Sequence, residues 1–71
     1  MKETPGLLDV VALREDVAEE RLVRGQVGTV VEDLGQEAYL IEFSDREGRT
    51  YAMVELSGTQ LMVLRYDPVV A

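Results

Sequence analysis

The chain has 71 residues, with fourteen Asp and Glu against seven Lys and Arg, a formal net charge of −7, and neither Cys nor His. This composition excludes disulfides and a zinc site built from Cys and His. The acidic excess is opposite in sign to the field that neutralises nucleic-acid phosphates. We expect a cytoplasmic protein, because Cys is absent and no apolar run is long enough for a signal peptide or a membrane span.

Apolar, β-branched runs separated by glycine-marked turns predict an all-β domain. The first predicted strand follows Pro5–Gly6, and a long acidic loop at 15–25 separates it from the second. The strands are expected at 7–14, 26–33, 38–44, 49–56 and 61–66. Hairpin turns are expected at 34–37 and 45–48, and a tight turn or one turn of 3-10 helix at 57–60.

Strand order and loop lengths together predict an SH3-like small five-stranded barrel, with a long first loop and a short 3-10 turn before the last strand. A single domain is expected over 1–71, with its core at about 7–66 and with ends at 1–5 and 67–71 that fray. Alternation in the third strand places Tyr39, Ile41 and Phe43 on one face. In the fourth strand, the expected inward residues are Ala52, Val54 and Leu56, and the expected outward or rim residues are Tyr51, Met53 and Glu55.

The segment LVRGQVGTVVED at 22–33 contains the two most informative glycines. Gly25 is predicted to supply a turn with positive φ, and Gly28 a bulge that lets Val27 and Val30 both reach the core. Leu22 is expected to point inward from the long loop. The predicted structural glycines of the turns and the bulge are Gly25, Gly28 and Gly48.

No arrangement of residues in the sequence favours catalysis, so we expect no enzyme, no catalytic residue, no cofactor and no metal site. Glu42 and Glu55 are a conceivable acid–base pair, but such a pair needs a cleft that separates the two pKa values. The alternative is that both face outward and pair with Arg46, Arg49 or Arg65. The segment SDREGR at 44–49 offers too few oxygens for a calcium loop and is interpreted as a turn.

Aromatic and methionine side chains give the candidate binding surface. Leu40, Tyr51, Met53 and Tyr66 are predicted to share one outer face, where an apolar patch marks a partner site. The alternative is that they complete a thin core or form the seam of a homo-oligomer. The chain has no Trp, which disfavours a groove for proline-rich peptides.

One pattern runs from Asp9 to Gly48: an apolar strand that opens with Asp, an acidic loop, a Leu-x-x-Gly-x-x-Gly-Thr-Val-Val segment, and then Tyr-x-x-Glu-Phe, Asp and Gly. The positions that carry it are Asp9, Leu22, Gly25, Gly28, Thr29, Val30, Val31, Tyr39, Glu42, Phe43, Asp45 and Gly48. This pattern resembles that of a bacterial group of small proteins, domain-of-unknown-function family 4926. The resemblance covers roughly residues 7–64 and implies an SH3-like fold without an established activity or catalytic residues. A weaker likeness over 24–31 is to the KOW motif of ribosomal and transcription-factor barrels.

Three functions remain open from the sequence. The first is a non-enzymatic acidic interaction module that docks or neutralises a basic protein partner. The second is a KOW-like RNA or ribosome-associated barrel with Arg21 and Arg24 on phosphates, although nearby acids would repel these. The third is a small accessory subunit of an enzyme complex. We favour the first, and expect neither nucleic acid nor membrane as a partner.

Overall fold

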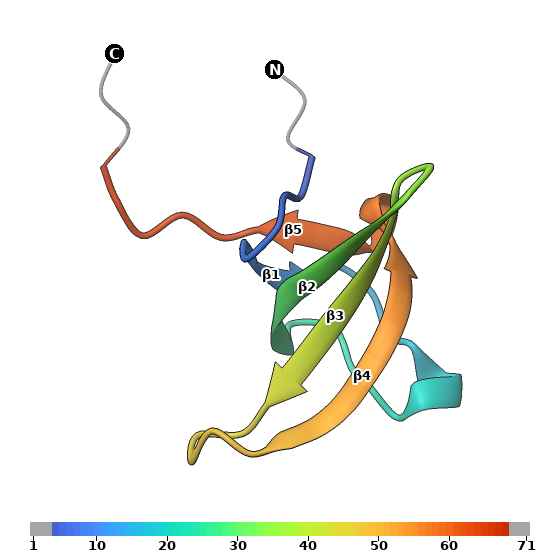
Figure 1. Cartoon of the computed structure of the whole chain (residues 1–71). Helices are drawn as coiled ribbons and strands as arrows, with labels where there is room; N and C mark the ends of the chain where they lie inside the picture. The colour runs from blue at the N-terminus through green and yellow to red at the C-terminus, as the bar shows by residue number, and fades with distance from the viewer. Residues whose placement is uncertain (1–3, 69–71) are drawn as a thin grey trace.

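The computed structural model describes residues 4–68. It is all-β, with five antiparallel strands and two short 3-10 helices (Figure 1). The long loop after β1 contains η1, and η2 separates β4 from β5. In chain order the elements are β1 (Val10–Leu13), η1 (Ala18–Glu20), β2 (Val27–Gly35), β3 (Ala38–Ser44), β4 (Thr50–Ser57), η2 (Gly58–Gln60) and β5 (Leu61–Val63).

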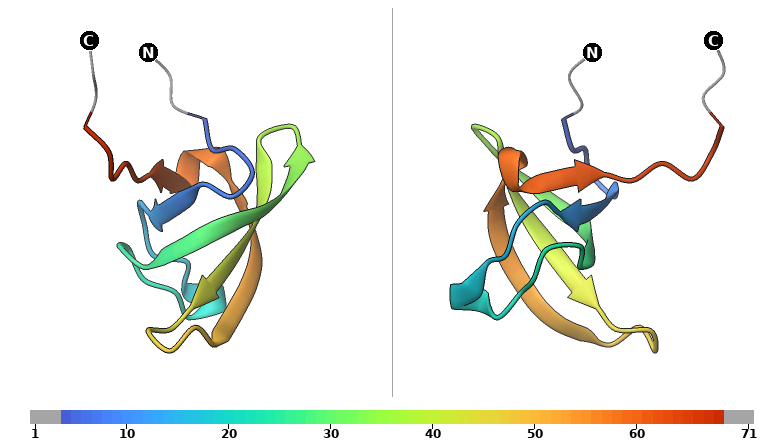
Figure 2. Two further views of the ribbon diagram at one scale, coloured as in Figure 1. Left: turned by 60° about the vertical axis from the view of Figure 1, so that its left-hand side comes forward. Right: turned by 180° about the vertical axis from the view of Figure 1, so that it is seen from behind.

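The strands form one bent antiparallel sheet in the order β4-β3-β2-β1-β5. The sheet rolls around its inner face, and the loop that carries η1 lies across the open side of the roll (Figure 2). This order, the long first loop and the 3-10 turn before the last strand confirm the predicted SH3-like barrel. The bounds of β3 coincide with the prediction, whereas β5 ends at Val63 instead of residue 66.

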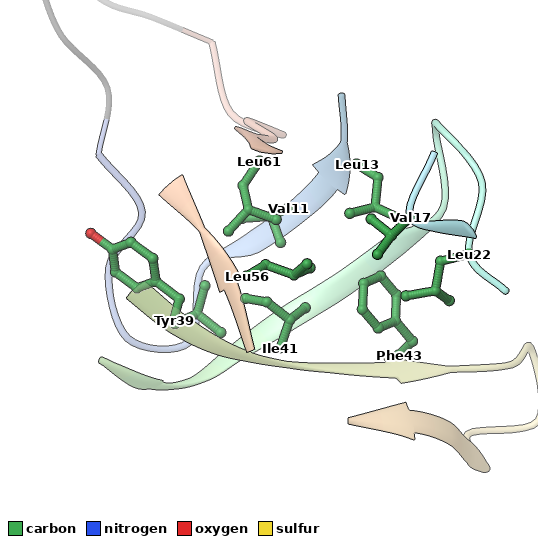
Figure 3. Packing of buried hydrophobic residues seen from close by; sticks show 10 residues of the cluster. Val11, Leu13, Val17, Leu22, Tyr39, Ile41, Phe43, Leu56 and Leu61 are labelled. Carbon is green, nitrogen blue, oxygen red and sulfur yellow. The ribbon is translucent and has the colours of Figure 1, made fainter. Parts of the chain in front are cut away.

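The core fills the inside of the roll with side chains from every strand and from the long loop (Figure 3). The expected inward residues of β3 are buried, and the loop contributes Val17 and Leu22, which pair as an isolated bridge. On β4, Leu56 is buried and Ala52 and Val54 pack against the core as predicted. The buried residues are Val11, Leu13, Val17, Leu22, Val30, Tyr39, Ile41, Phe43, Leu56 and Leu61.

The bulge predicted at Gly28 lies instead at Val31, where the pairing register with β3 shifts. Because β2 is regular between residues 27 and 30, alternation puts Gly28 and Val30 inside and leaves Val27 46% exposed. The prediction that Val27 reaches the core is therefore wrong. Gly28 is buried for another reason, since it lies opposite Phe43 on the crowded inner face.

The start of the chain differs from the predicted strand 7–14. A turn precedes β1: the amide of Asp9 donates to the carbonyl of Gly6, and the Asp9 carboxylate accepts from the amide of Gly6. Leu8 has a φ of 69°, which is incompatible with a strand, so β1 starts at Val10. Pro5 is buried, so the expected fraying does not extend to it, and residues 1–3 and 69–71 lie outside the described residues.

The predicted turn at 45–48 is confirmed and is organised by Asp45. Its carboxylate accepts from the amides of Glu47 and Arg49, each at 2.9 Å. Gly25 has a φ of 94°, which confirms the positive φ predicted for it, and Gly48, predicted as a turn glycine, has a φ of 85°.

Candidate functional site

The outer face of β2, β3 and β4 brings three carboxylates and two apolar side chains together. Directly opposite residues of neighbouring strands project to the same face of a sheet. Leu40 on β3 lies opposite Glu32 on β2 and opposite Glu55 on β4. A leucine therefore lies between two glutamates in one cross-strand row.

In the adjacent row on this face, the central residue is acidic. Glu42 on β3 lies opposite Thr29 on β2 and opposite Met53 on β4. Leu40 and Met53 are thus diagonal neighbours, a relationship that places side chains within about 7–8 Å. We call the surface formed by Glu32, Leu40, Glu42, Met53 and Glu55 the acidic face.

The apolar part of the acidic face is accessible to a partner. Met53 is 52% exposed and Leu40 is half-buried. The hydroxyl of Thr50 donates a hydrogen bond to the carboxylate of Glu42, which fixes this carboxylate beside Met53. An exposed apolar centre with a charged rim is the usual anatomy of a protein-binding surface.

The carboxylates of the acidic face are not neutralised from within the described chain. Across residues 4–68, no arginine forms an ion pair with Glu32, Glu42 or Glu55. Arg49, which the sequence offered as a partner for Glu42 and Glu55, instead pairs with Asp45 at 3.2 Å and with Glu47 at 3.6 Å. Arg49 thus pairs with carboxylates of its own turn, and the acidic face keeps its negative charge.

Two of the four predicted partner-binding residues lie on the acidic face, namely Leu40 and Met53. Tyr51 does not, because the register shift between β3 and β4 makes it the extra residue of a bulge. Its ring lies 6.2 Å from the buried ring of Phe43, and its hydroxyl accepts a hydrogen bond from the Gln26 side chain at 3.2 Å. Tyr51 therefore lies at the rim of the sheet, where its ring contacts Phe43 and half of its side chain stays exposed.

Tyr66 also lies away from the acidic face. It follows β5, at the edge of the sheet opposite to β4, and is 75% exposed. It lines a hollow of about 550 Å³ together with Leu8, Asp9 and Val10. The four residues therefore do not share one outer face: Tyr51 lies at the rim beside Phe43, and the chain leaves the sheet before Tyr66.

The loop that resembles a KOW motif is held in place by hydrogen bonds within the chain. The amide of Arg24 donates to the carboxylate of Asp16 at 2.8 Å, and Gly25 donates to the carbonyl of Leu13. Arg21 closes η1 in the left-handed conformation, directly after Glu19 and Glu20. Two carboxylates thus lie beside the first arginine, which disfavours phosphate at this loop.

The described residues contain no cluster of three or more Asp and Glu that could hold a metal ion. Within the same range, no helix has the length and apolar character needed to cross a membrane. Glu32 is the member of the acidic face that sequence reasoning missed. Its position follows from the register of the β2–β3 hairpin, which depends on the bulge at Val31.

Fold and surface together define a small SH3-like barrel with an acidic outer sheet face. The chain belongs to the family described as Domain of unknown function (DUF4926), whose family model matches residues 7–63. This match spans all five strands and confirms the resemblance drawn from the sequence. Searches of curated proteins and of solved structures returned no match.

Proposed function

We propose that this protein is a non-enzymatic interaction module that docks a basic protein partner on the acidic face. The observation that carries the proposal is the pair of rows in which Leu40 and Met53 are interleaved with three glutamates. Buried apolar contacts supply most of the affinity of a protein interface, and the charged rim selects the partner. A partner of complementary shape would present an apolar centre surrounded by Lys or Arg.

The overall charge supports the same proposal. At a net charge of −7, the whole molecule attracts a basic partner before contact, and such steering raises association rates. The carboxylates of the acidic face lack intramolecular cations among residues 4–68, so a partner does not have to displace an existing ion pair. Binding is therefore expected to weaken as salt concentration rises.

Affinity capture from the lysate of the source organism tests the proposal, with two double variants of matched charge. Glu32→Lys with Glu55→Lys reverses both charges beside Leu40. Glu19→Lys with Glu20→Lys makes the same change in net charge on η1, away from the acidic face.

The proposal predicts that the wild-type protein and the η1 variant retain the same basic protein, and that the acidic-face variant loses it. Equal capture by both variants would mean that the acidic face is not the docking site. Capture of no protein by the wild type at low salt would contradict the proposal as a whole.

A further inference from the structure

The strand β4 forms one edge of the sheet, next to the acidic face. In the strand order β4-β3-β2-β1-β5, only β3 pairs with β4. Across residues 4–68, no backbone hydrogen bond joins Thr50–Ser57 to a segment other than β3. Alternate residues along this edge therefore present N–H and C=O groups without a backbone partner among residues 4–68, and these groups can pair with an added strand. The amide of Ser57 is an exception, because it donates to the side chain of Gln60 at 2.9 Å.

We propose that β4 binds an extended segment of a basic protein as a sixth strand of the sheet. This inference rests on the proposed function, because it takes the basic partner from there and specifies how the partner binds. Backbone hydrogen bonds along the edge would give affinity, and side chains beside the acidic face would give specificity. Figure 1 shows β4 at the outer edge of the sheet, beside β3.

The register of β3 and β4 predicts the sequence pattern of the added strand. The row Glu32–Leu40–Glu55 would continue into a residue opposite Glu55, which charge complementarity requires to be Lys or Arg. The row that ends at Met53 would continue into an apolar residue. These two positions are separated by one residue, which would lie opposite the half-buried Val54 and face inward.

The usable part of the edge is the half of β4 after Tyr51. The bulge at Tyr51 interrupts regular pairing, and the Tyr51 hydroxyl is bonded to Gln26 of the loop that precedes β2. From Ala52 to Ser57 the pairing with β3 is regular, so no bulge interrupts the edge over these residues. A segment of about five to seven residues matches this length, at about 3.3 Å per residue.

A second copy of the same chain fits this edge less well than a basic segment does. Two molecules with a net charge of −7 repel each other, and pairing of β4 with its own copy would bring Met53, Val54 and Glu55 from both chains together without supplying a cation. A basic segment removes both sources of repulsion.

The experiment uses the full-length protein labelled with ¹⁵N and four synthetic heptapeptides. The parent peptide is acetyl-Thr-Lys-Val-Leu-Val-Lys-Thr-amide, in which Lys and Leu share one face of a strand. Two further peptides carry N-methyl groups either on both Val residues or on the Lys, Leu and Lys residues. The fourth replaces both Lys residues with Glu.

Because only one edge of an added strand pairs with β4, we expect one methylation pattern to weaken binding at least tenfold and the other to leave it nearly unchanged. The parent peptide should shift the amide signals of residues 52–57 and protect the alternate amides that face the free edge, and the Glu peptide should not bind.

Strand addition would be overturned if both N-methylated peptides bound as well as the parent, or if the peptide shifted amide signals outside β4. Either result would leave docking on the acidic face intact. No binding of the parent peptide would likewise overturn this inference, whereas the proposed function would still stand or fall by the capture experiment. Equal binding of the Lys and Glu peptides would contradict charge selection itself, and with it the proposed function. If the amide signals of β4 shifted with protein concentration in the absence of peptide, the strand added to β4 would be a second copy of this chain, and the basic segment would be ruled out as its partner.

Discussion

A β-carbon on Gly28 would lie 2.6 Å from Cγ2 of Ile41, so the inner face of β2 has no room for a side chain at this position. The carbonyl oxygen of Glu42 would lie at 2.9 Å from the same carbon, and backbone yields less easily than a side chain. Gly28→Ala is therefore expected to lower the free energy of unfolding by about 1–3 kcal/mol, and Gly28→Val by more. Urea denaturation measures both.

Gly6→Ala is the matched control for this prediction. A β-carbon on Gly6 would meet only Asp9 Oδ2, at an ordinary contact distance of 3.6 Å, so its effect should be small. A Gly28→Val variant as stable as the wild type would show that the packing around Ile41 adapts, and would contradict the role assigned to Gly28.

Leu22 is a core residue although it belongs to a loop. It is 2% exposed, and its backbone pairs with Val17 in both directions. Leu22→Ala should cost about 2–5 kcal/mol of stability, as a substitution in the sheet would. Val23→Ala, at an exposed neighbour, should change stability by less than about 0.5 kcal/mol. Similar thermal midpoints for the two variants would show that the loop does not contribute to the core.

Asp45 stabilises the turn between β3 and β4 through its side chain. Its carboxylate accepts two backbone amides and pairs with Arg49. Asp45→Ala should lower the free energy of unfolding by about 1–2 kcal/mol, because two amides lose their partner. Arg46→Ala in the same turn is the control, and should leave stability nearly unchanged. Equal denaturation midpoints for these variants would contradict the assigned role of Asp45.

Tyr51 and Met53 are close in sequence and similarly exposed, at 49% and 52%, but they are expected to respond differently. Tyr51→Ala removes a ring that packs against Phe43 and should cost at least about 1 kcal/mol of stability. Met53→Ala should leave stability within about 0.5 kcal/mol and weaken binding of the basic partner. Denaturation and binding measured on both variants distinguish these effects, and the opposite pattern would reverse the two assignments.

The sequence was sufficient where a short-range pattern determines the structure. Strict alternation in β3 predicted which of its residues are buried, and the glycine that ends the long loop predicted the positive φ of Gly25. The order of short strands and loops was enough to predict the barrel class. Each of these depends on neighbours within a few residues along the chain.

Bulges and the irregular end of the chain account for the errors. The bulge in β2 lies at Val31 and not at Gly28, which leaves Val27 exposed, and a second bulge at Tyr51 separates this residue from the acidic face. Neither bulge has a distinctive sequence signal. Leu8 adopts a left-handed conformation although its neighbours are typical of a strand. Membership of Glu32 in the acidic face depends on one of these bulges, so sequence patterns alone did not reveal it.

The central claim is that the acidic face docks a basic protein. Its most direct test is the dissociation constant of the captured partner for the wild type and for the two charge-matched double variants, at about 50 and 200 mM salt. We predict affinity that weakens with salt, a large loss for Glu32→Lys with Glu55→Lys, and a small loss for Glu19→Lys with Glu20→Lys. Equal losses for both double variants would contradict a specific docking face, and affinity independent of salt would contradict a basic partner.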